Sequence, residues 1–177
     1  MARLVVTEFY SLDGVVENPA WTGPYWNDEI AGFKQEEHSA ADVMLLGRVT
    51  YEGFAEAWPS RRDDDYSRKF NEMEKRVVTS TLTSFDWENS HRLEGDNVAD
   101  GVKALKQGDG GDILVHGSVT LVQELFSQGL VDELRLAIYP VALGTGRRLF
   151  DSVEASLQLV SQQSTSTGVI LARYLSA

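Results

Sequence analysis

The stretch MLLGRVTYEGF, at residues 44–54, joins a predicted strand to a predicted helix through a single glycine. Val43 to Leu46 is a short apolar run, which is typical of a strand buried within a sheet. Gly47 ends that run, and a helical pattern follows from Thr50 to Ala57 before Pro59 stops it. A strand that passes directly into a helix is the unit from which α/β folds are built.

A second stretch, ILVHGSVTLVQEL at residues 113–125, repeats this design with Gly117 at the turn. Its strand is Ile113 to Val115, and Ser118 to Gln128 places apolar side chains along one face of a helix. Strands and helices alternate along the rest of the chain, with strands expected at 4–9, 76–79 and 134–141 and helices expected at 27–37, 66–74 and 98–106.

Two late segments, Leu157 to Ser164 and Gly168 to Leu175, have the pattern of an antiparallel hairpin that closes the sheet. Together with the alternation, they predict an α/β fold: a three-layer sandwich with a mixed, mostly parallel sheet flanked by helices. The 177 residues contain no internal repeat and no linker-like stretch, so we expect one domain spanning residues 1–177.

Composition excludes several classes of protein. The chain has no cysteine, which rules out disulfides, thiolate metal sites and cysteine nucleophiles. The net charge of −11 argues against non-specific binding to nucleic acid or to anionic membranes, because both require basic surfaces. It does not argue against a nucleotide cofactor, since a few local cations can hold a phosphate.

No apolar run approaches the roughly 20 residues that a membrane helix requires. The segment MARLVVTEFYSLDG enters a strand-like pattern directly and has no A-x-A cleavage pattern. We therefore expect a cytoplasmic protein.

The two strand-to-helix turns suit a phosphate. A helix N-terminus presents unpaired N–H groups and the positive end of its dipole, and glycine lets a ligand approach the backbone. Two such turns at one sheet edge can hold the two phosphates of a dinucleotide, with Arg48 adding a cation and Thr50, Ser118 and Thr120 adding hydroxyls. The alternative is that both glycines only end strands and that Ser118 only caps a helix.

A third strand end, RVVTST at residues 76–81, places Ser80 and Thr81 at the same predicted edge. These hydroxyls are candidates for binding a ribose phosphate. The alternative is an ordinary turn, in which serine and threonine are common.

Four stretches of the sequence resemble, in their order and spacing, the dihydrofolate-reductase-like superfamily. They are residues 44–54, 76–81 and 113–125, and LVDELRLAIYPVALGTGRRLF at 130–150. The similarity is greatest to the branch related to the reductase domain of the riboflavin-pathway deaminase-reductase. TEFYSLDGVVE, at residues 7–17, resembles the opening S-x-D-G segment of that branch. The resemblance covers nearly the whole chain.

The resemblance implies NADPH as the cofactor. It places two phosphate-binding turns at Gly47, Arg48, Val49 and Thr50 and at His116, Gly117, Ser118, Val119 and Thr120. It places Ser80 and Thr81 near the adenosine 2′-phosphate, with Arg48 close by. The Gly-Gly pair of the family reads Gly117-Ser118 here, and the arginines with which the branch holds a phosphorylated pyrimidine are not recognisable.

The resemblance also aligns EIAGFK, residues 29–34, with the helix that carries the acid of dihydrofolate reductases. This alignment implies Glu29 as a proton donor and Phe33 on the substrate side. Asp13 is the other candidate acid, and a carboxyl with a raised pKa can relay the proton that a C=N reduction needs. The alternatives are that Glu29 only complements the helix dipole and that Asp13 only forms a turn before Gly14.

The remaining candidates are aromatic and histidine side chains. Trp21, Trp26 and Trp58 are predicted to line the pocket of a flat substrate, although core packing explains them equally well. His38 follows two glutamates on a predicted helix, so we expect it to be solvated. The histidines show no metal-ligand spacing, and no metal site is expected.

The sequence therefore predicts an NADPH-dependent reductase of a small heteroaromatic (pterin- or pyrimidine-like) or carbonyl substrate. A true dihydrofolate reductase and a non-catalytic nucleotide-binding protein remain as alternatives. The expected partner is a second copy of the chain in a C2 homodimer, because the late strands and residues 134–140 are more apolar than one sheet face requires.

Overall fold

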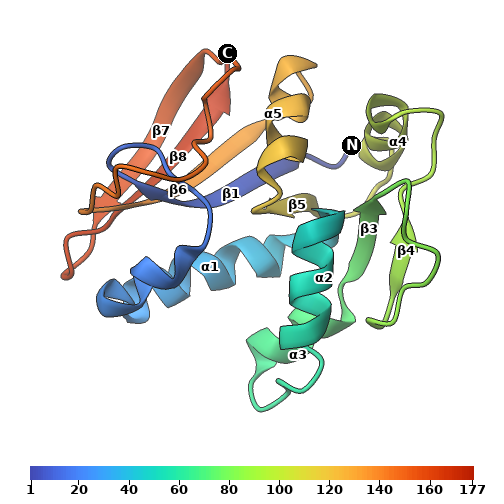
Figure 1. The fold of residues 1–177 in the computed structure, drawn as a ribbon, viewed down its shortest axis with the longest axis horizontal. Coiled ribbons are helices and arrows are strands. Elements are labelled where there is room, and N and C mark those ends of the chain that lie inside the picture. The colour runs from blue at the N-terminus through green and yellow to red at the C-terminus, as the bar shows by residue number, and fades with distance from the viewer.

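A computed structural model describes all 177 residues and contains one eight-stranded sheet (Figure 1). The strand order is β4-β3-β2-β5-β1-β6-β8-β7. The strands are β1 (Leu4–Ser11), β2 (Ala41–Gly47), β3 (Glu74–Val78), β4 (Ser90–Arg92), β5 (Asp112–His116), β6 (Glu133–Tyr139), β7 (Leu157–Ser164) and β8 (Ile170–Ser176).

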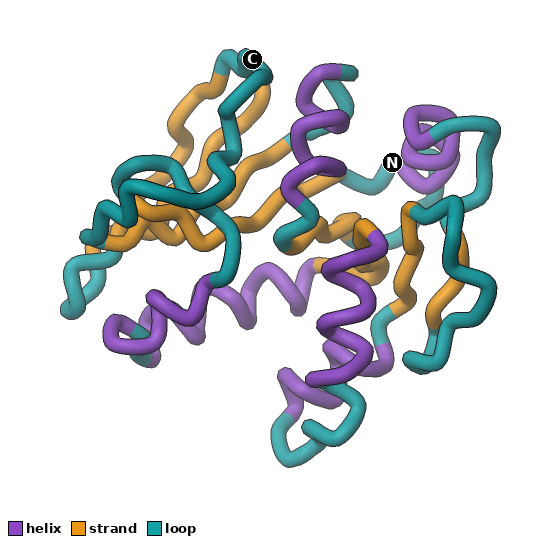
Figure 2. The backbone as a smooth tube through the Cα atoms, viewed as in Figure 1, coloured by secondary structure: helices purple, strands orange, loops and turns teal.

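Helices connect consecutive parallel strands except β3 and β4, which a loop joins, as the tube view shows (Figure 2). They are the 3-10 helix η1 (Pro19–Tyr25) and the α-helices α1 (Asp28–Ala40), α2 (Arg48–Ala57), α3 (Asp65–Glu72), α4 (Val98–Lys106) and α5 (Val119–Ser127). None of these helices is both long enough and apolar enough to span a bilayer.

The six strands from β4 to β6 pair in parallel, whereas β8 pairs antiparallel with β6 and β7 antiparallel with β8. The predicted α/β class, the mostly parallel sheet and the C-terminal hairpin are thus confirmed. Two short elements were not predicted: β4, which has only three residues, and η1, whose two prolines and glycine read as a loop.

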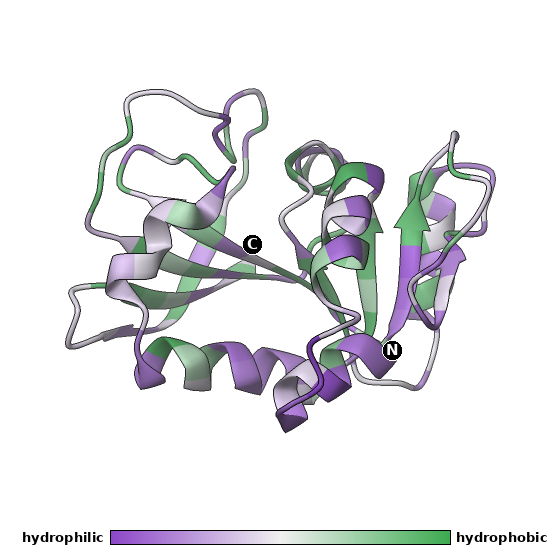
Figure 3. Ribbon diagram, turned by 60° about the horizontal axis from the view of Figure 1, so that its bottom comes forward, coloured by the Kyte–Doolittle hydropathy of each residue, from purple (hydrophilic) through white to green (hydrophobic).

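Helices cover both faces of the sheet, which makes three layers (Figure 3). Apolar side chains fill the space between the helices and each face. On one face, α4 and α5 pack against alternate residues of β1 and β5, such as Val6 and Val115. On the other face, α2 and α3 pack over Val5 and Leu114, and α1 packs over β6 and β8. Successive side chains of a strand point to opposite faces of the sheet, so each strand contributes to the hydrophobic cores on both faces.

The strands diverge at the carboxyl end of β5. Thr7 of β1 pairs with His116, the last residue of β5, whereas β1 continues alongside β6 as far as Ser11. Beyond His116, the chain leaves the sheet and enters α5. An opening outside the carboxyl ends of the strands is where open α/β sheets bind their ligands.

Candidate cofactor- and substrate-binding site

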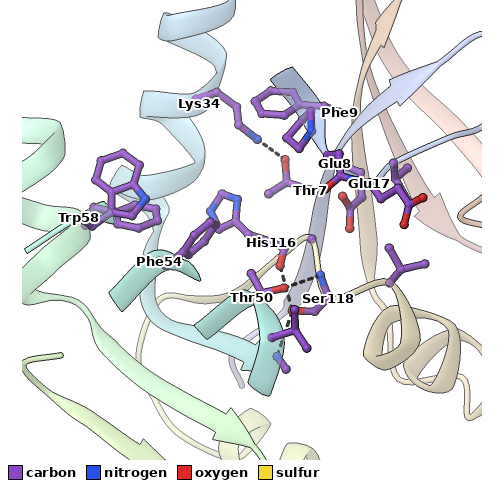
Figure 4. A pocket seen from close by; sticks show the side chains of 18 of the residues that line it. Thr7, Glu8, Phe9, Glu17, Lys34, Thr50, Phe54, Trp58, His116 and Ser118 are labelled. Atoms are coloured by element: carbon purple, nitrogen blue, oxygen red, sulfur yellow. Dashed lines mark hydrogen bonds between the residues drawn. The ribbon is translucent and has the colours of Figure 1, made fainter. Parts of the chain in front are cut away.

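A cavity of about 990 Å³ occupies this opening (Figure 4). Three sets of residues form its walls. The first set is the two strand-to-helix turns, at 47–50 and 116–120. The second set comes from β1 and α1, and includes Thr7, Glu8 and Lys34. The third set is aromatic and comes from α2 and α3, namely Phe54, Trp58, Tyr66 and Phe70.

The two turns contact each other directly. The backbone N–H of Gly47 donates a hydrogen bond to Ser118 Oγ at 3.0 Å. The backbone N–H of Ser118 in turn donates to Thr50 Oγ1 at 3.0 Å. Two segments that lie 70 residues apart in sequence therefore form one continuous wall, as the resemblance implied for a pair of phosphate-binding turns.

The helices that begin at this wall lack side-chain caps. Asn27, Asp64 and Asn97 each accept a hydrogen bond from a first-turn N–H of α1, α3 and α4, respectively. No side chain does so for α2 or α5. Their first-turn N–H groups are therefore open to an anion, with the positive ends of the two helix dipoles behind them.

The second turn has an unusual backbone. Gly117 has a φ of 53° and Ser118 a φ of 54°, so both residues are in the left-handed region. A serine there is held by hydrogen bonds, because its Oγ also donates to the carbonyl of His116 at 3.1 Å. Successive residues with positive φ direct their N–H groups differently from a regular helix start, and the N–H of Ser118 is already bound by Thr50 Oγ1.

A buried ionic triad lies deeper in the cavity wall. Lys34 Nζ donates to Thr7 Oγ1 at 2.6 Å and to Glu37 Oε2 at 2.8 Å. Thr7 Oγ1 donates to Glu37 Oε1 at 2.8 Å, which closes a ring of three hydrogen bonds. All three residues are buried, but only Lys34 and Thr7 line the cavity.

Two histidines form the neighbouring part of the wall. His38 Nε2 lies 3.0 Å from His116 Nε2 and 3.2 Å from the hydroxyl of Tyr66. Burial, reinforced by the positive charge of Lys34, lowers the pKa of His38 to about 3 and the pKa of His116 well below its ordinary value. Both rings are therefore neutral. The expectation that His38 is solvated is wrong, because α3 and β5 cover that face of α1.

Glu8 is a second buried carboxyl beside the cavity. It is 4% exposed, and its Oε1 has no hydrogen-bond partner. Burial raises the pKa of Glu8 well above its ordinary value, against the opposing effect of Lys34. The raised pKa favours the neutral form of the carboxyl, which can donate a hydrogen bond.

Asp13 does not line the cavity. Its carboxylate accepts hydrogen bonds from Ser11 Oγ and from the backbone N–H groups of Leu143 and Gly144. These bonds lower the pKa of Asp13 far below its ordinary value, so it stays ionised and cannot act as an acid near neutral pH. The candidate role of Asp13 as a proton donor is corrected: it anchors the loop after β6.

Glu29 does not line the cavity either. Its Oε2 accepts from the backbone N–H and the Oγ of Ser166, both at 2.8 Å, and these bonds lower the pKa of Glu29. It therefore ties the start of α1 to the β7–β8 turn. Phe33 and Trp21 pack with the core of α1 and the hairpin, outside the cavity lining, whereas Trp26 and Trp58 do line the cavity.

Ser80 and Thr81 follow β3 at the expected sheet edge but lie outside the cavity wall. Arg48 lines the cavity and forms an ion pair with Glu52 at 2.8 Å. The role of these three side chains toward a 2′-phosphate stays a prediction. No group of three or more histidine, aspartate or glutamate side chains is arranged to hold a metal ion.

Sequence reasoning missed Lys34, Glu8 and Thr7 as site residues. A signal was present for Glu8 and Thr7, because two polar residues interrupt the apolar strand that begins at Leu4. Lys34 follows the apolar stripe of α1 at helical spacing, and a lysine there is usually solvated.

The fold, with a cavity at the carboxyl ends of its strands, is that of the dihydrofolate-reductase-like α/β proteins. A family model described as RibD C-terminal domain matches residues 2–171. The chain belongs to this family. It is 31% identical over 133 residues to the uncharacterized protein YyaP of Bacillus subtilis (strain 168), covering 73% of this chain and 71% of that protein.

Solved structures show the same fold. A pyrimidine reductase-like protein from Corynebacterium diphtheriae has a TM-score of 0.72 and 15% identity, covering 99% of this chain and 92% of that one. The deaminase/5-amino-6-(5-phosphoribosylamino)uracil reductase of Thermotoga maritima has a TM-score of 0.74 and 13% identity, with coverages of 99% and 57%. Dihydrofolate reductase from Enterococcus faecalis, complexed with NADP(H), has a TM-score of 0.66 and 16% identity, with coverages of 98% and 96%.

Proposed function

We propose that this protein is an NADPH-dependent reductase of a small, flat heteroaromatic or carbonyl compound, similar to 5-amino-6-(5-phosphoribosylamino)uracil reductase. The observation that carries the proposal is the joined pair of uncapped helix starts, at Gly47 and Ser118, along one wall of a large cavity. Membership of a family of reductase domains supports it.

The residues present fit a dinucleotide. The N–H groups at the starts of α2 and α5 would hold the phosphates, and Arg48 and Arg147 line the same wall. Arg147 already donates a hydrogen bond to Thr120 Oγ1 at 2.8 Å, which places a guanidinium at the start of α5. When bound, the nicotinamide would supply the hydride, while the protein would supply binding and orientation.

A true dihydrofolate reductase is the weaker candidate. The resemblance placed its acid at Glu29, but that carboxylate is occupied by Ser166 outside the cavity. The carboxyls of Glu8 and Glu17 and the ammonium of Lys34 are ionisable groups that line the cavity near β1.

Quenching of tryptophan fluorescence tests cofactor binding, because Trp26 and Trp58 line the cavity. We expect NADPH to quench it and NADH to bind more weakly. NADPH oxidation is then measured with a panel of pterins, pyrimidines and quinones. Turnover confined to dihydrofolate would support the second candidate. Binding of NADPH with no turnover would support a non-catalytic nucleotide-binding protein, and no binding would overturn the proposal.

A C2 homodimer is proposed as the assembled state. The outermost strand, β7, is exposed along nearly its whole length, and its Leu159 and Val160 are 51% and 54% exposed. A long exposed edge strand favours pairing, and a second copy offers the same surface. Sedimentation at micromolar concentration should give twice the mass of the 19.7 kDa chain, and a monomer mass would contradict the proposal.

A further inference from the structure

The part of the cavity between β1, α1, α2 and α3 differs chemically from the two turns, and we call it the aromatic lobe. Its walls carry the rings of Phe9, Phe54, Trp58 and Phe70. Trp58 and Phe70 are stacked with their ring centroids 4.0 Å apart, and Phe54 meets Phe70 edge-on at 5.5 Å. If the turns hold the cofactor, as the proposed function requires, this lobe is left for the substrate.

Lys34 is the buried cation of the aromatic lobe, with only 5% of its surface exposed. An ammonium group has three hydrogens to donate. Two of them are bound by Thr7 and Glu37, and the third makes no hydrogen bond, although the ring of Phe9 lies 4.9 Å from Nζ. Figure 4 shows Lys34 reaching from α1 toward Thr7 and Phe9, with His116 and Phe54 across the same space.

The surroundings of Lys34 make this free hydrogen a strong donor. The two nearby imidazoles, His38 and His116, are held neutral and carry no charge that would compete with Lys34. The one carboxylate hydrogen-bonded to Lys34 is that of Glu37. Glu37 lies behind Lys34 and does not line the cavity. Hydrogen bonds from a charged donor are stronger than neutral ones, and a low dielectric strengthens them further.

The geometry also limits the shape of the ligand. Lys34 Nζ lies 4.9 Å from the centroid of the Phe9 ring. A ligand atom that binds this ammonium therefore lies close to aromatic surface, which suits a planar ring bearing an oxygen or nitrogen acceptor on its edge. The other cation toward this lobe, Arg61, is exposed and lies over Trp58, with its guanidinium carbon 5.1 Å from the ring centroid.

We propose that Lys34 is the substrate-binding donor of this site: its free N–H binds the carbonyl oxygen or ring nitrogen of a planar, unphosphorylated heteroaromatic compound. Thr7 and Glu37 are positioning residues, because they fix the ammonium in place through the other two hydrogens. This inference rests on the proposed function, which assigns the two turns to the cofactor and leaves the aromatic lobe for the substrate.

Lumazine, a bicyclic pteridinedione with carbonyl and ring-nitrogen acceptors and no phosphate, is the probe. Its binding is measured by tryptophan quenching, with and without saturating NADPH. We expect Lys34→Met to weaken lumazine binding about ten- to a hundredfold, the range for a hydrogen bond to a charged group, and to leave NADPH binding unchanged. Lys69→Met is the matched control, because it removes the same charge near His38 but outside the cavity. It should change lumazine binding by less than about twofold.

Lys34→Met leaves the buried carboxylate of Glu37 without its partner, so it can fail to fold. The double variant Lys34→Met with Glu37→Gln removes that charge and is measured in parallel. A folded double variant that binds NADPH normally and has lost lumazine supports the proposal. Lumazine binding within about twofold of wild type in either folded variant overturns it, as does equal loss of lumazine and NADPH.

The two proposals fail separately. Wild-type protein that binds NADPH but not lumazine overturns the role of Lys34 and leaves the reductase proposal standing. Wild-type protein that binds lumazine through Lys34 but does not bind NADPH overturns the reductase proposal instead. Loss of lumazine in Glu8→Gln but not in Lys34→Met would assign the donor to Glu8 and overturn the proposal.

Discussion

Gly47 and Gly117 are both half-buried, but the helices that follow them begin in different surroundings. Val49, two residues after the first glycine, is 70% exposed, and Val119, two residues after the second, is 7% exposed. Gly47 has an ordinary extended backbone with a φ of −75°, whereas Gly117 has a φ of 53°. The same sequence design therefore serves two physical roles: the first turn adds the charge of Arg48, and the second adds a backbone with positive φ.

The two glycines also differ in whether their backbone conformation would accept another residue. A Cβ built on Gly47 would meet Ser118 Cβ and Oγ at 3.5 Å, which is ordinary contact. A Cβ on Gly117 would also find space, with Thr50 Oγ1 at 3.5 Å, but its positive φ is strained for any other residue and most for a β-branched one. Lack of space for a side chain thus does not explain why either position is glycine. The positive φ explains it for Gly117 alone.

Gly117→Val should have the largest effect. Strain at the positive φ costs about 1–3 kcal/mol of stability, and the relaxed turn no longer presents its N–H groups, so NADPH binding should be lost. Gly47→Ala is the control and should bind NADPH with little change in thermal midpoint. Both quantities are measured on the same purified proteins. A folded Gly117→Val protein that binds NADPH as well as wild type would defeat the two-turn model.

Arg48→Ala tests whether the first turn contributes charge. Removing a charge-assisted hydrogen bond worth roughly 1.5–3 kcal/mol should weaken NADPH about ten- to a hundredfold and NADH much less. Titration of both cofactors by fluorescence quenching gives the ratio. Equal losses for NADPH and NADH would show that Arg48 does not recognise the 2′-phosphate.

Glu8→Gln tests what burial beside the second turn does to an ionisable group. The folded-state pKa of Glu8 is raised, so its neutral form fits the fold and its contribution to stability is complete below the unfolded-state pKa. That contribution is lost as the pH rises toward the folded-state pKa. Glutamine stays neutral, so it should stabilise the protein by about 1–3 kcal/mol at neutral pH and have no such effect near pH 4.

Denaturant unfolding of wild type and Glu8→Gln across that range measures the difference in free energy of unfolding. Comparing the two proteins cancels the opposite pH dependence of the depressed carboxylates, such as Asp13 and Glu29. A difference that is constant with pH would show that Glu8 is not held neutral.

Ser118→Ala should have the smallest effect. It removes the acceptor for the Gly47 N–H and should lower the free energy of unfolding by about 0.5–1.5 kcal/mol. Ser118→Gly loses the same bond but regains roughly 1 kcal/mol, because glycine accepts the positive φ without strain. Glycine should therefore be the more stable of the two variants, and the reverse order would show that the φ at this position is unstrained.

Most of the fold follows from local patterns. The helix at Val98–Lys106 and the strand at Leu157–Ser164 have the predicted bounds, because apolar periodicity and flanking turn residues mark them. β4 escaped prediction because its three residues, Ser90–Arg92, carry no apolar pattern and are ordered only by pairing with β3.

The site likewise has one part that could be predicted from local sequence and one part that could not. Both glycine turns were predicted at residue level, because a strand end followed at once by a helix start is visible in sequence. The acidic candidates were misplaced, because Asp13 and Glu29 have the composition of catalytic residues but are tied to Leu143 and Ser166, more than 120 positions away. No local pattern carries contacts of that separation.

The sequence by itself determined the α/β class, the closing hairpin and the two turns, since each depends on residues within about a dozen positions of one another. Only the tertiary structure decided which ionisable groups meet the cavity. Lys34 belongs to the site because α1 crosses β1 at Thr7, and the pKa of Glu8 is raised because the packed layers exclude water from it. The charge state and accessibility of a side chain depend on what long-range packing brings around it.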